Sequence, residues 1–366
     1  MHAESAKTQK AKTISLLFIK SNKLKFALFI AFLLPQKLQT LISLVESIFS
    51  VNDSTFHKIA LEVFKYQYEH VEIYRLFCNS LGKNPGNVNT VLQIPFLPIE
   101  FFKSHAIITE GHTAQAIFES SGTTGSVSSK HFVADTKLYE RSFISAFEKF
   151  YGPAADYVYL ALLPSYLERN NSSLVYMAQK LMDISQKNAN GFFLDNTSYL
   201  YDLLEALKAG KRKTVLLGVT FALLDFAVAH KTDFPDLIIM ETGGMKGRRE
   251  EMTRAEVHSI LKTSFGVSNI HSEYGMTEML SQAYSKGNGI FYPCNTLKIL
   301  IRDLYDPMQV EQNQTTGGVN IIDLANLYSC SFIATGDLGK LYNDGSFEIL
   351  GRMAQTDVRG CNLMVV

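Results

Sequence analysis

The sequence lacks the excess of basic residues that proteins binding long polyanions carry. Its 366 residues include 35 Lys and Arg and 35 Asp and Glu, so the formal net charge is zero at pH 7. Because affinity for nucleic acid rests largely on basic residues that neutralise phosphates, we do not expect a nucleic-acid partner. A zero net charge does not exclude a small anion, which local dipoles and a few side chains can bind.

Cysteine is also scarce, and its spacing argues against the common structural uses of the thiol. The four cysteines, Cys78, Cys294, Cys330 and Cys361, form no Cys-x-x-Cys pair, so we expect no zinc site. A chain of this length buries about three quarters of its unfolded surface and needs no disulfide framework. We therefore predict a reduced, cytoplasmic protein in which the first three cysteines are structural.

No apolar run is long enough to cross a bilayer. The apolar run over residues 26–34 follows three lysines and ends at Pro35, and it is about half the ~20 residues that a spanning helix needs. This pattern is similar to a signal peptide, but no small-residue cleavage site follows it. We expect residues 1–40 to form a disordered or dispensable extension without a stable membrane span; export or membrane contact is the alternative.

The rest of the sequence alternates between short apolar strands and amphipathic helices. Apolar residues recur at threes and fours over 41–80, which predicts helices. The predicted strands that follow are 117–119, 157–163, 191–194, 214–217, 236–241 and 268–272, and the predicted helices are 136–151, 174–184, 199–209, 221–229 and 248–265. This alternation predicts an α/β fold built from parallel βαβ units.

Short strand candidates separated by turns follow residue 289, which predicts a small antiparallel β region. We therefore divide the chain into a helical entry with an α/β core over 41–290 and a β-rich portion with a C-terminal tail over 291–366.

A loop rich in glycine and hydroxyl groups follows the first predicted strand. It consists of Ser120, Ser121, Gly122, Thr123, Thr124 and Gly125. The glycines let the backbone approach a ligand closely, and a helix after the loop would offer free N–H groups. Such a loop suits a triphosphate, although it is not a Walker A loop because no Gly-Lys-Ser/Thr follows. The alternative is a flexible surface turn.

This hexapeptide resembles the phosphate-binding signature of the adenylate-forming superfamily, which includes acyl-CoA synthetases, luciferases and non-ribosomal adenylation domains. A second segment, over 273–278, resembles the Tyr-Gly-x-Thr-Glu motif of that superfamily. The resemblance implies that Tyr274 and Gly275 lie against adenine, that Thr277 contacts the α-phosphate, and that Glu278 binds Mg²⁺. Glutamate is a suitable hard oxygen ligand for such a metal.

Three shorter matches complete the series in the same order. Gly243 and Gly244 resemble the glycine-rich stretch along the adenine, and Asp337 matches the aspartate that holds the ribose hydroxyls. Arg352 matches the arginine that opens the hinge motif and reaches the nucleotide. The carboxylates that usually follow this arginine are replaced here, so an ordinary domain-rotating hinge is not expected.

The resemblance also implies a small C-terminal domain whose lysine serves the adenylation step, and we expect this chain to lack that domain. We predict that Lys130, which lies nearest the phosphate loop, replaces this lysine; Lys103 and Lys246 are the alternatives. A shortened chain with a cysteine near its end resembles the LuxE-type acyl-protein synthetases. Those proteins pass the acyl group to a C-terminal cysteine, from which a reductase partner collects it.

Cys361 is the matching cysteine, and it has chemical support of its own. It follows a glycine, and Arg359 nearby favours the nucleophilic thiolate. The alternative is a buried structural cysteine. The resemblance implies a ligase that uses ATP and Mg²⁺ to activate a fatty or other carboxylic acid and loads the acyl group onto Cys361, with an acyl reductase or acyl carrier protein as partner.

Two other functions stay open. One is a ligase of the phenylacetate-CoA-ligase-like type that uses an external acceptor such as coenzyme A. The other is a non-catalytic protein that binds nucleotide.

Overall fold

The computed structural model describes residues 36–121, 127–164, 171–243, 252–304, 306, 310 and 315–353. The chain divides into two compact units, Met1–Ser50 and Val51–Val366. The described part of the first unit is helix α2 (Gln36–Phe49), so the last residues of the predicted extension are helical. Within the described ranges, no helix combines the length and the apolar character that crossing a membrane requires.

A seven-stranded sheet forms the centre of the second unit, with strand order β10-β9-β8-β7-β6-β4-β5. The parallel strands are β4 (Val158–Leu162), β5 (Gly191–Phe192), β6 (Thr214–Val219), β7 (Ile238–Thr242) and β8 (His271–Tyr274). At the β8 edge, β9 (Ala283–Ser285) and β10 (Tyr292–Pro293) are antiparallel. The predicted parallel βαβ core is confirmed.

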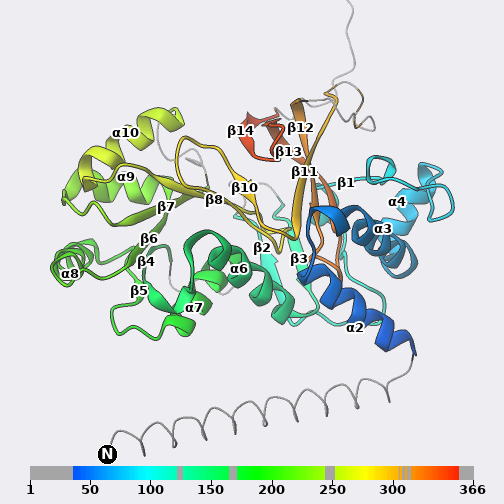
Figure 1. Ribbon diagram of the computed structural model, residues 1–366, viewed down its shortest axis with the longest axis horizontal. Helices are drawn as coiled ribbons and strands as arrows, with labels where there is room; N and C mark the ends of the chain where they lie inside the picture. The colour runs from blue at the N-terminus through cyan, green and yellow to red at the C-terminus, as the bar shows by residue number, and fades with distance from the viewer. Residues whose placement is uncertain are drawn as a thin grey trace, which may run out of the picture. The chain divides into compact units, whose positions relative to one another are not determined.

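Helices cover both faces of this sheet (Figure 1). They are α6 (Thr136–Tyr151), α7 (Ser173–Ser185), α8 (Thr197–Ala209), α9 (Thr220–Ala229) and α10 (Arg254–Phe265). Leu160 and Leu216 of the sheet share one apolar core with α8, α9 and α10, whereas Tyr159 of β4 faces Phe147 of α6. All five residues of β4 are buried, as expected for a parallel strand between two helical layers.

A five-stranded sheet follows along the chain. It contains β11 (Leu297–Arg302), β12 (Thr316–Asp323), β13 (Phe332–Leu341) and β14 (Phe347–Arg352), which pair antiparallel as predicted. Its fifth strand, β1 (Leu97–Pro98), comes from the N-terminal half and pairs in parallel with β13. The boundary at residue 290 therefore stays a prediction, because the β-rich portion shares its sheet with an earlier segment.

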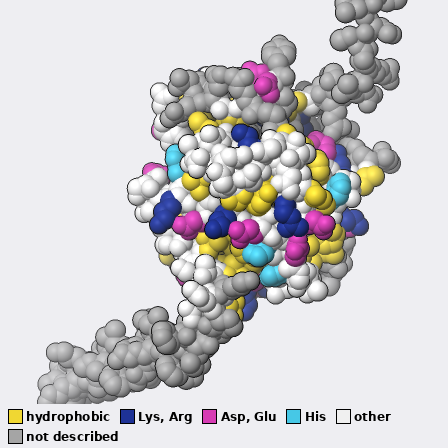
Figure 2. Space-filling model, turned by 90° about the vertical axis from the view of Figure 1, so that its right-hand side faces the viewer, with side chains coloured by type: hydrophobic (Ala, Val, Ile, Leu, Met, Phe, Trp, Pro, Cys, Tyr) yellow, Lys and Arg dark blue, Asp and Glu magenta, His cyan; other side chains and the backbone are white. Residues whose placement is uncertain are grey.

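The helical entry consists of α3 (Asp53–His70), α4 (Glu72–Ser80) and the short turns η1 (Val91–Gln93) and α5 (Phe101–Ser104). A further turn, η2 (Ala154–Asp156), precedes β4. On the face shown in Figure 2, basic and acidic side chains are interspersed among the described residues without a broad patch of one sign.

The segment around the predicted phosphate loop differs from our prediction. The loop does not lead directly into a helix, because β2 (Ala116–Glu119) and β3 (Lys130–Val133) pair antiparallel across it. Helix α6 begins only at Thr136, where the Asp135 side chain accepts a hydrogen bond from the Lys137 amide. The N-terminus of α6 is therefore not part of this loop, so the expectation that a helix directly after the loop would offer it free N–H groups was wrong.

Candidate functional site

The carboxyl ends of β7 and β8 bring two of the predicted motifs side by side. Thr242 and Glu273 are paired in register, and the Thr242 hydroxyl donates to Glu273 Oε2 at 2.9 Å. Gly243 follows with φ of 74°, in the left-handed region that favours glycine. Gly244 lies outside the described residues. Ligands of α/β sheets bind beyond the carboxyl ends of the strands, so these segments occupy the expected edge.

Glu273 is a buried carboxyl that our sequence analysis did not assign to the site. Burial raises its pKa to about 7, and the hydrogen bond from Thr242 opposes this rise. Its carboxyl folds over Gly275, where a Cβ atom would overlap Glu273 Oε1. Gly275 is therefore required for the local packing of the motif, independently of any ligand.

Tyr274, Asp337 and Arg352 form one connected group. The Tyr274 hydroxyl donates to Asp337 Oδ2 at 2.9 Å, and Arg352 Nε lies 3.5 Å from Asp337 Oδ1. Burial raises the pKa of Asp337, while the bond from Tyr274 and the charge of Arg352 oppose the rise. The exposed Arg352 side chain leaves this end of the group open to solvent, whereas the Tyr274 ring packs against Phe347. Residues far apart in the sequence thus share one polar cluster.

Thr277 and Glu278 lie in the loop between β8 and β9. Glu278 is only 5% exposed, and burial raises the pKa of its carboxyl. The nearby Ser129 side chain and the positive charges of Arg352 and Lys103 oppose the rise. Because Ser129 directly precedes β3, the contact connects Glu278 to the hairpin that carries the phosphate loop.

Two hydrogen bonds between Ser120 and Ser129 close the base of that hairpin. The Ser129 amide donates to Ser120 Oγ at 2.9 Å, and the Ser120 amide donates to the Ser129 carbonyl at 3.0 Å. Of the other predicted loop residues, Ser121 is described, and Gly122, Thr123, Thr124 and Gly125 lie outside the described residues.

The lysine predicted to serve the adenylation step, Lys130, is paired with a carboxylate. Its Nζ lies 3.3 Å from Glu119 Oε1, and its side chain is about half exposed. Lys103, one of the two alternatives, lies close enough for its charge to act on Glu278. Lys246, the other alternative, is outside the described residues.

Glu278 offers a single carboxylate as a ligand, which suits a magnesium ion that is shared with a phosphate-bearing substrate. No cluster of three or more His, Cys, Asp or Glu side chains that could hold a metal occurs in the described part of the chain. Mg²⁺ is commonly held by one or two carboxylates, with water and substrate phosphates as its other ligands. The buried Glu278 carboxylate would gain the counter-charge that burial demands.

The three described cysteines are all buried, as expected for structural residues. Burial raises the pKa of Cys78 to about 12 and also raises those of Cys294 and Cys330, which disfavours their thiolates. Cys361 lies outside the described residues. The Met353 amide donates to the Gly336 carbonyl at 2.9 Å. Cys361 lies eight positions after Met353, so the chain limits their Cα separation to about 27 Å.

Comparison with known proteins identifies the family. The family model for the LuxE acyl-protein synthetases matches residues 46–366, which is most of the chain. The chain belongs to the LuxE acyl-protein synthetase family. A long-chain-fatty-acid–luciferin-component ligase from Photorhabdus luminescens is 32% identical over 69 residues, or 19% of this LuxE family chain and 59% of that relative.

Solved structures of ligases share the fold of this LuxE family member. A 2-hydroxyisobutyryl-CoA ligase in the postadenylation state has a TM-score of 0.59 at 14% identity, over 82% of this chain and 68% of its own. ATP-bound MatB from Rhodopseudomonas palustris has a TM-score of 0.51 at 19% identity, over 67% of this chain. The match spans 49% of MatB, about half of that protein. The predicted adenylate-forming large-domain fold is confirmed.

The structure adds three buried residues that our sequence analysis did not assign to the site: His131, Asp323 and Asn326. Their side chains hydrogen-bond to the backbone of the loop that carries Thr277 and Glu278. His131 lies six residues after the glycine that closes the phosphate loop. No local sequence pattern indicates a backbone partner so distant along the chain.

Proposed function

We propose that this protein activates a carboxylic acid of the fatty-acid class with ATP and transfers the acyl group to a thiol, that of Cys361. The observation that supports this most strongly is the direct contact among motif segments that are far apart in the sequence. Tyr274 donates to Asp337, and Ser129 beside the phosphate loop lies close enough to Glu278 to lower the pKa of its carboxyl. The family and the ligase fold favour the same chemistry.

In the first step, an oxygen of the substrate carboxylate attacks the α-phosphorus of ATP. The bond from that phosphorus to the oxygen bridging it to the β-phosphorus breaks, and pyrophosphate leaves with the bonding electrons. The product is a mixed anhydride of the acid and AMP. The protein mainly positions the reacting groups and stabilises charge, because both reactants are anionic and repel each other.

Each of the described site residues has a role that follows from its functional group. Asp337 accepts hydrogen bonds from the ribose hydroxyls, and Arg352 beside it is exposed and free to turn toward a nucleotide phosphate. Thr277 donates to the α-phosphate. Glu278 would hold Mg²⁺, and this ion would neutralise charge on the phosphate oxygens. Lys130 or Lys103 supplies further positive charge to the departing pyrophosphate.

In the second step, the thiolate of Cys361 attacks the acyl carbonyl carbon. The bond from that carbon to the phosphate oxygen breaks, AMP leaves, and the thiol proton passes to solvent. The tether from Met353 is compatible with this assignment, because the chain can place Cys361 at most about 27 Å from Met353, whose amide binds the Gly336 carbonyl. An acyl reductase or acyl carrier protein would then collect the thioester.

Intact-protein mass spectrometry tests this function. The native protein and Cys361→Ser are incubated with Mg-ATP and a panel of fatty and aromatic acids, and ATP–pyrophosphate exchange is measured on the same samples. We expect an acyl mass increment on the native protein alone and pyrophosphate exchange by both proteins.

Three results would contradict parts of this proposal. Full acyl transfer by Cys361→Ser to added coenzyme A or carrier protein would establish an external acceptor. An equal mass increment on both proteins would move the acceptor to another residue. Tight ATP binding without exchange for any acid would indicate a protein that only binds nucleotide.

A further inference from the structure

The loop that carries Thr277 and Glu278 has no regular secondary structure to fix it. It runs between β8, which ends at Tyr274, and β9, which begins at Ala283. A side chain whose position matters for chemistry requires a backbone that is held in place. The hydrogen bonds that other residues make to the backbone of this loop therefore indicate how Glu278 is held in place.

Two consecutive carbonyls of the loop accept hydrogen bonds from side chains outside it. His131 Nδ1 lies 2.8 Å from the Thr277 carbonyl, and Asn326 Nδ2 donates to the Glu278 carbonyl at 2.8 Å. A carbonyl oxygen only accepts, so the bond to Thr277 requires a proton on His131 Nδ1. Asn326 Oδ1, which lies 3.0 Å from Nε2, also only accepts, and burial lowers the pKa of His131 to about 4, so the neutral ring donates to one of these two oxygens. Both side chains are almost completely buried, so water does not compete for these bonds.

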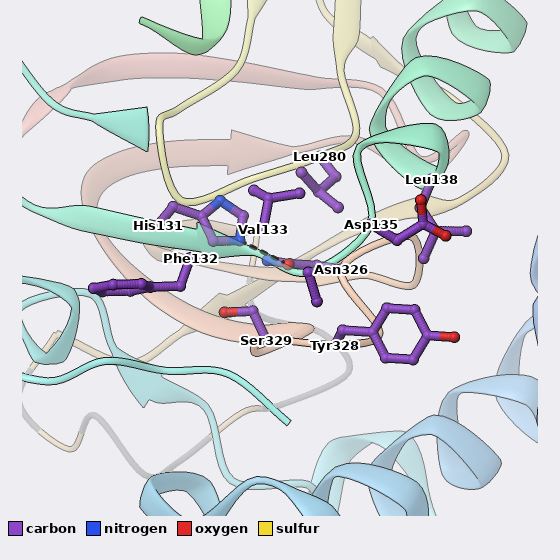
Figure 3. Close-up of a pocket in the computed structure, with 10 residues that line it drawn as sticks. His131, Phe132, Val133, Asp135, Leu138, Leu280, Asn326, Tyr328 and Ser329 are labelled. Carbon is purple, nitrogen blue, oxygen red and sulfur yellow. Dashed lines mark hydrogen bonds between the residues drawn. The ribbon is translucent and has the colours of Figure 1, made fainter. Parts of the chain in front are cut away.

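These two side chains also contact each other. His131 Nε2 lies 3.0 Å from Asn326 Oδ1, and the two residues face each other in Figure 3. The orientation of the Asn326 amide is determined by its second donor bond, from Nδ2 to the Cys330 carbonyl at 2.9 Å. Together they border a small pocket with room for about one water molecule.

A third side chain holds the following part of the loop. Asp323 Oδ2 accepts from the Leu280 amide at 2.6 Å and from the Ser281 amide at 3.1 Å. Strand β12 ends at Asp323, and Asn326 follows three residues later. The loop is thus held on one side by β3 and on the other by the end of β12.

We propose that His131 and Asn326 are positioning residues that hold the backbone of Thr277 and Glu278 against the phosphate hairpin. Strand β3 carries His131, which contacts the Thr277 carbonyl, and Asn326 donates to the next carbonyl, that of Glu278. Two buried side chains from different parts of the chain therefore hold the backbone of the motif. This inference rests on the proposed adenylation, in which Glu278 acts on the reacting phosphates.

A matched pair of substitutions separates positioning from simple packing. In His131→Asn the amide nitrogen lies as many bonds from Cβ as Nδ1 does, so it can still donate to Thr277. In His131→Gln the amide nitrogen takes the place of Nε2, so the bond to Thr277 is lost. The control is Tyr159→Phe, which removes a buried 2.9 Å bond to the Ala154 carbonyl.

The experiment measures ATP–pyrophosphate exchange over a range of Mg²⁺ concentrations, thermal midpoints, and deuterium uptake of residues 275–282. We expect His131→Gln to lower kcat by about tenfold or more, since small misplacements of reacting groups are costly. It should also raise the Mg²⁺ requirement and the deuterium uptake. His131→Asn should stay within about threefold of the native kcat, and Tyr159→Phe should change the thermal midpoint alone.

The inference is overturned if His131→Gln matches Tyr159→Phe in kcat, Mg²⁺ requirement and deuterium uptake. If the native protein catalyses no exchange with any acid, the proposed function fails, and deuterium uptake alone decides the positioning. Should His131→Gln not fold, Asn326→Asp is measured in the same way. Its carboxylate would face the Glu278 and Cys330 carbonyls and repel them, so unchanged kcat and uptake there would also overturn the inference.

Discussion

Replacing Glu273 by glutamine should make the protein more stable at alkaline pH. Burial raises the pKa of this carboxyl from 4.5 to about 7, which means that folding disfavours its charged form. In the unfolded chain the proton is released near pH 4.5, and in the folded chain near pH 7. Between these values the folded state binds more protons, so the free energy of unfolding falls as the pH rises.

The size of the effect follows from the shift. A difference of about 2.5 pKa units corresponds to about 3.4 kcal/mol. This cost is fully present above about pH 7 and disappears below about pH 4.5. Glutamine is neutral at every pH and can still accept the hydrogen bond from Thr242. We therefore expect the free energy of unfolding of Glu273→Gln to exceed that of the native protein by about 3 kcal/mol at pH 8 and by less than about 1 kcal/mol at pH 5.

Urea unfolding followed by circular dichroism at pH 5 and pH 8 measures this difference. Both proteins contain the same other buried carboxyls, so subtracting their free energies isolates Glu273. Glu69→Gln, an exposed glutamate on α3, serves as the control and should show no such dependence on pH. An equal stability difference at the two pH values, or a variant less stable than the native protein at pH 8, would refute this reasoning.

Three further substitutions test the site. Tyr274→Phe removes the donor to Asp337, so the KM for ATP in pyrophosphate exchange should rise about tenfold with a smaller change in kcat. An unchanged KM would show that this contact does not contribute to ribose binding. Gly275→Ala places a Cβ against the Glu273 carboxyl and should lower the free energy of unfolding by about 1–3 kcal/mol, measured with urea. Glu278→Gln should reduce exchange by about a hundredfold or more at low Mg²⁺ and by less at high Mg²⁺, because this residue is proposed to hold the metal; unchanged exchange at low Mg²⁺ would contradict that role.

The order of strands and helices could be read from the sequence because each depends on residues close together in the chain. Periodicity predicted α6 with the observed bounds, Thr136–Tyr151, and it located the parallel strands to within a few residues. Helix α10 begins at Arg254, later than predicted, because Thr253 and Glu256 form a capping box there. The motif residues could also be assigned, since each motif is a contiguous string.

Pairings between distant segments could not be predicted in this way. Strand β3 was not predicted from the sequence, and it pairs with β2 across the phosphate loop, a partnership that its own four residues do not indicate. Cys361 as acceptor and Lys130 as the adenylation lysine stay predictions, because they rest on sequence position.

The α/β class, the order of the motifs and the chemical types of the site residues follow from short stretches of sequence. The contacts of Tyr274 with Asp337, of Ser129 with Glu278 and of His131 with the Thr277 carbonyl depend instead on the folded arrangement. These contacts join residues many tens of positions apart, and His131 and Thr277 are separated by 146 residues. Their geometry depends on how the two β-sheets and the hairpin pack together, and local residue preferences carry no information about that packing.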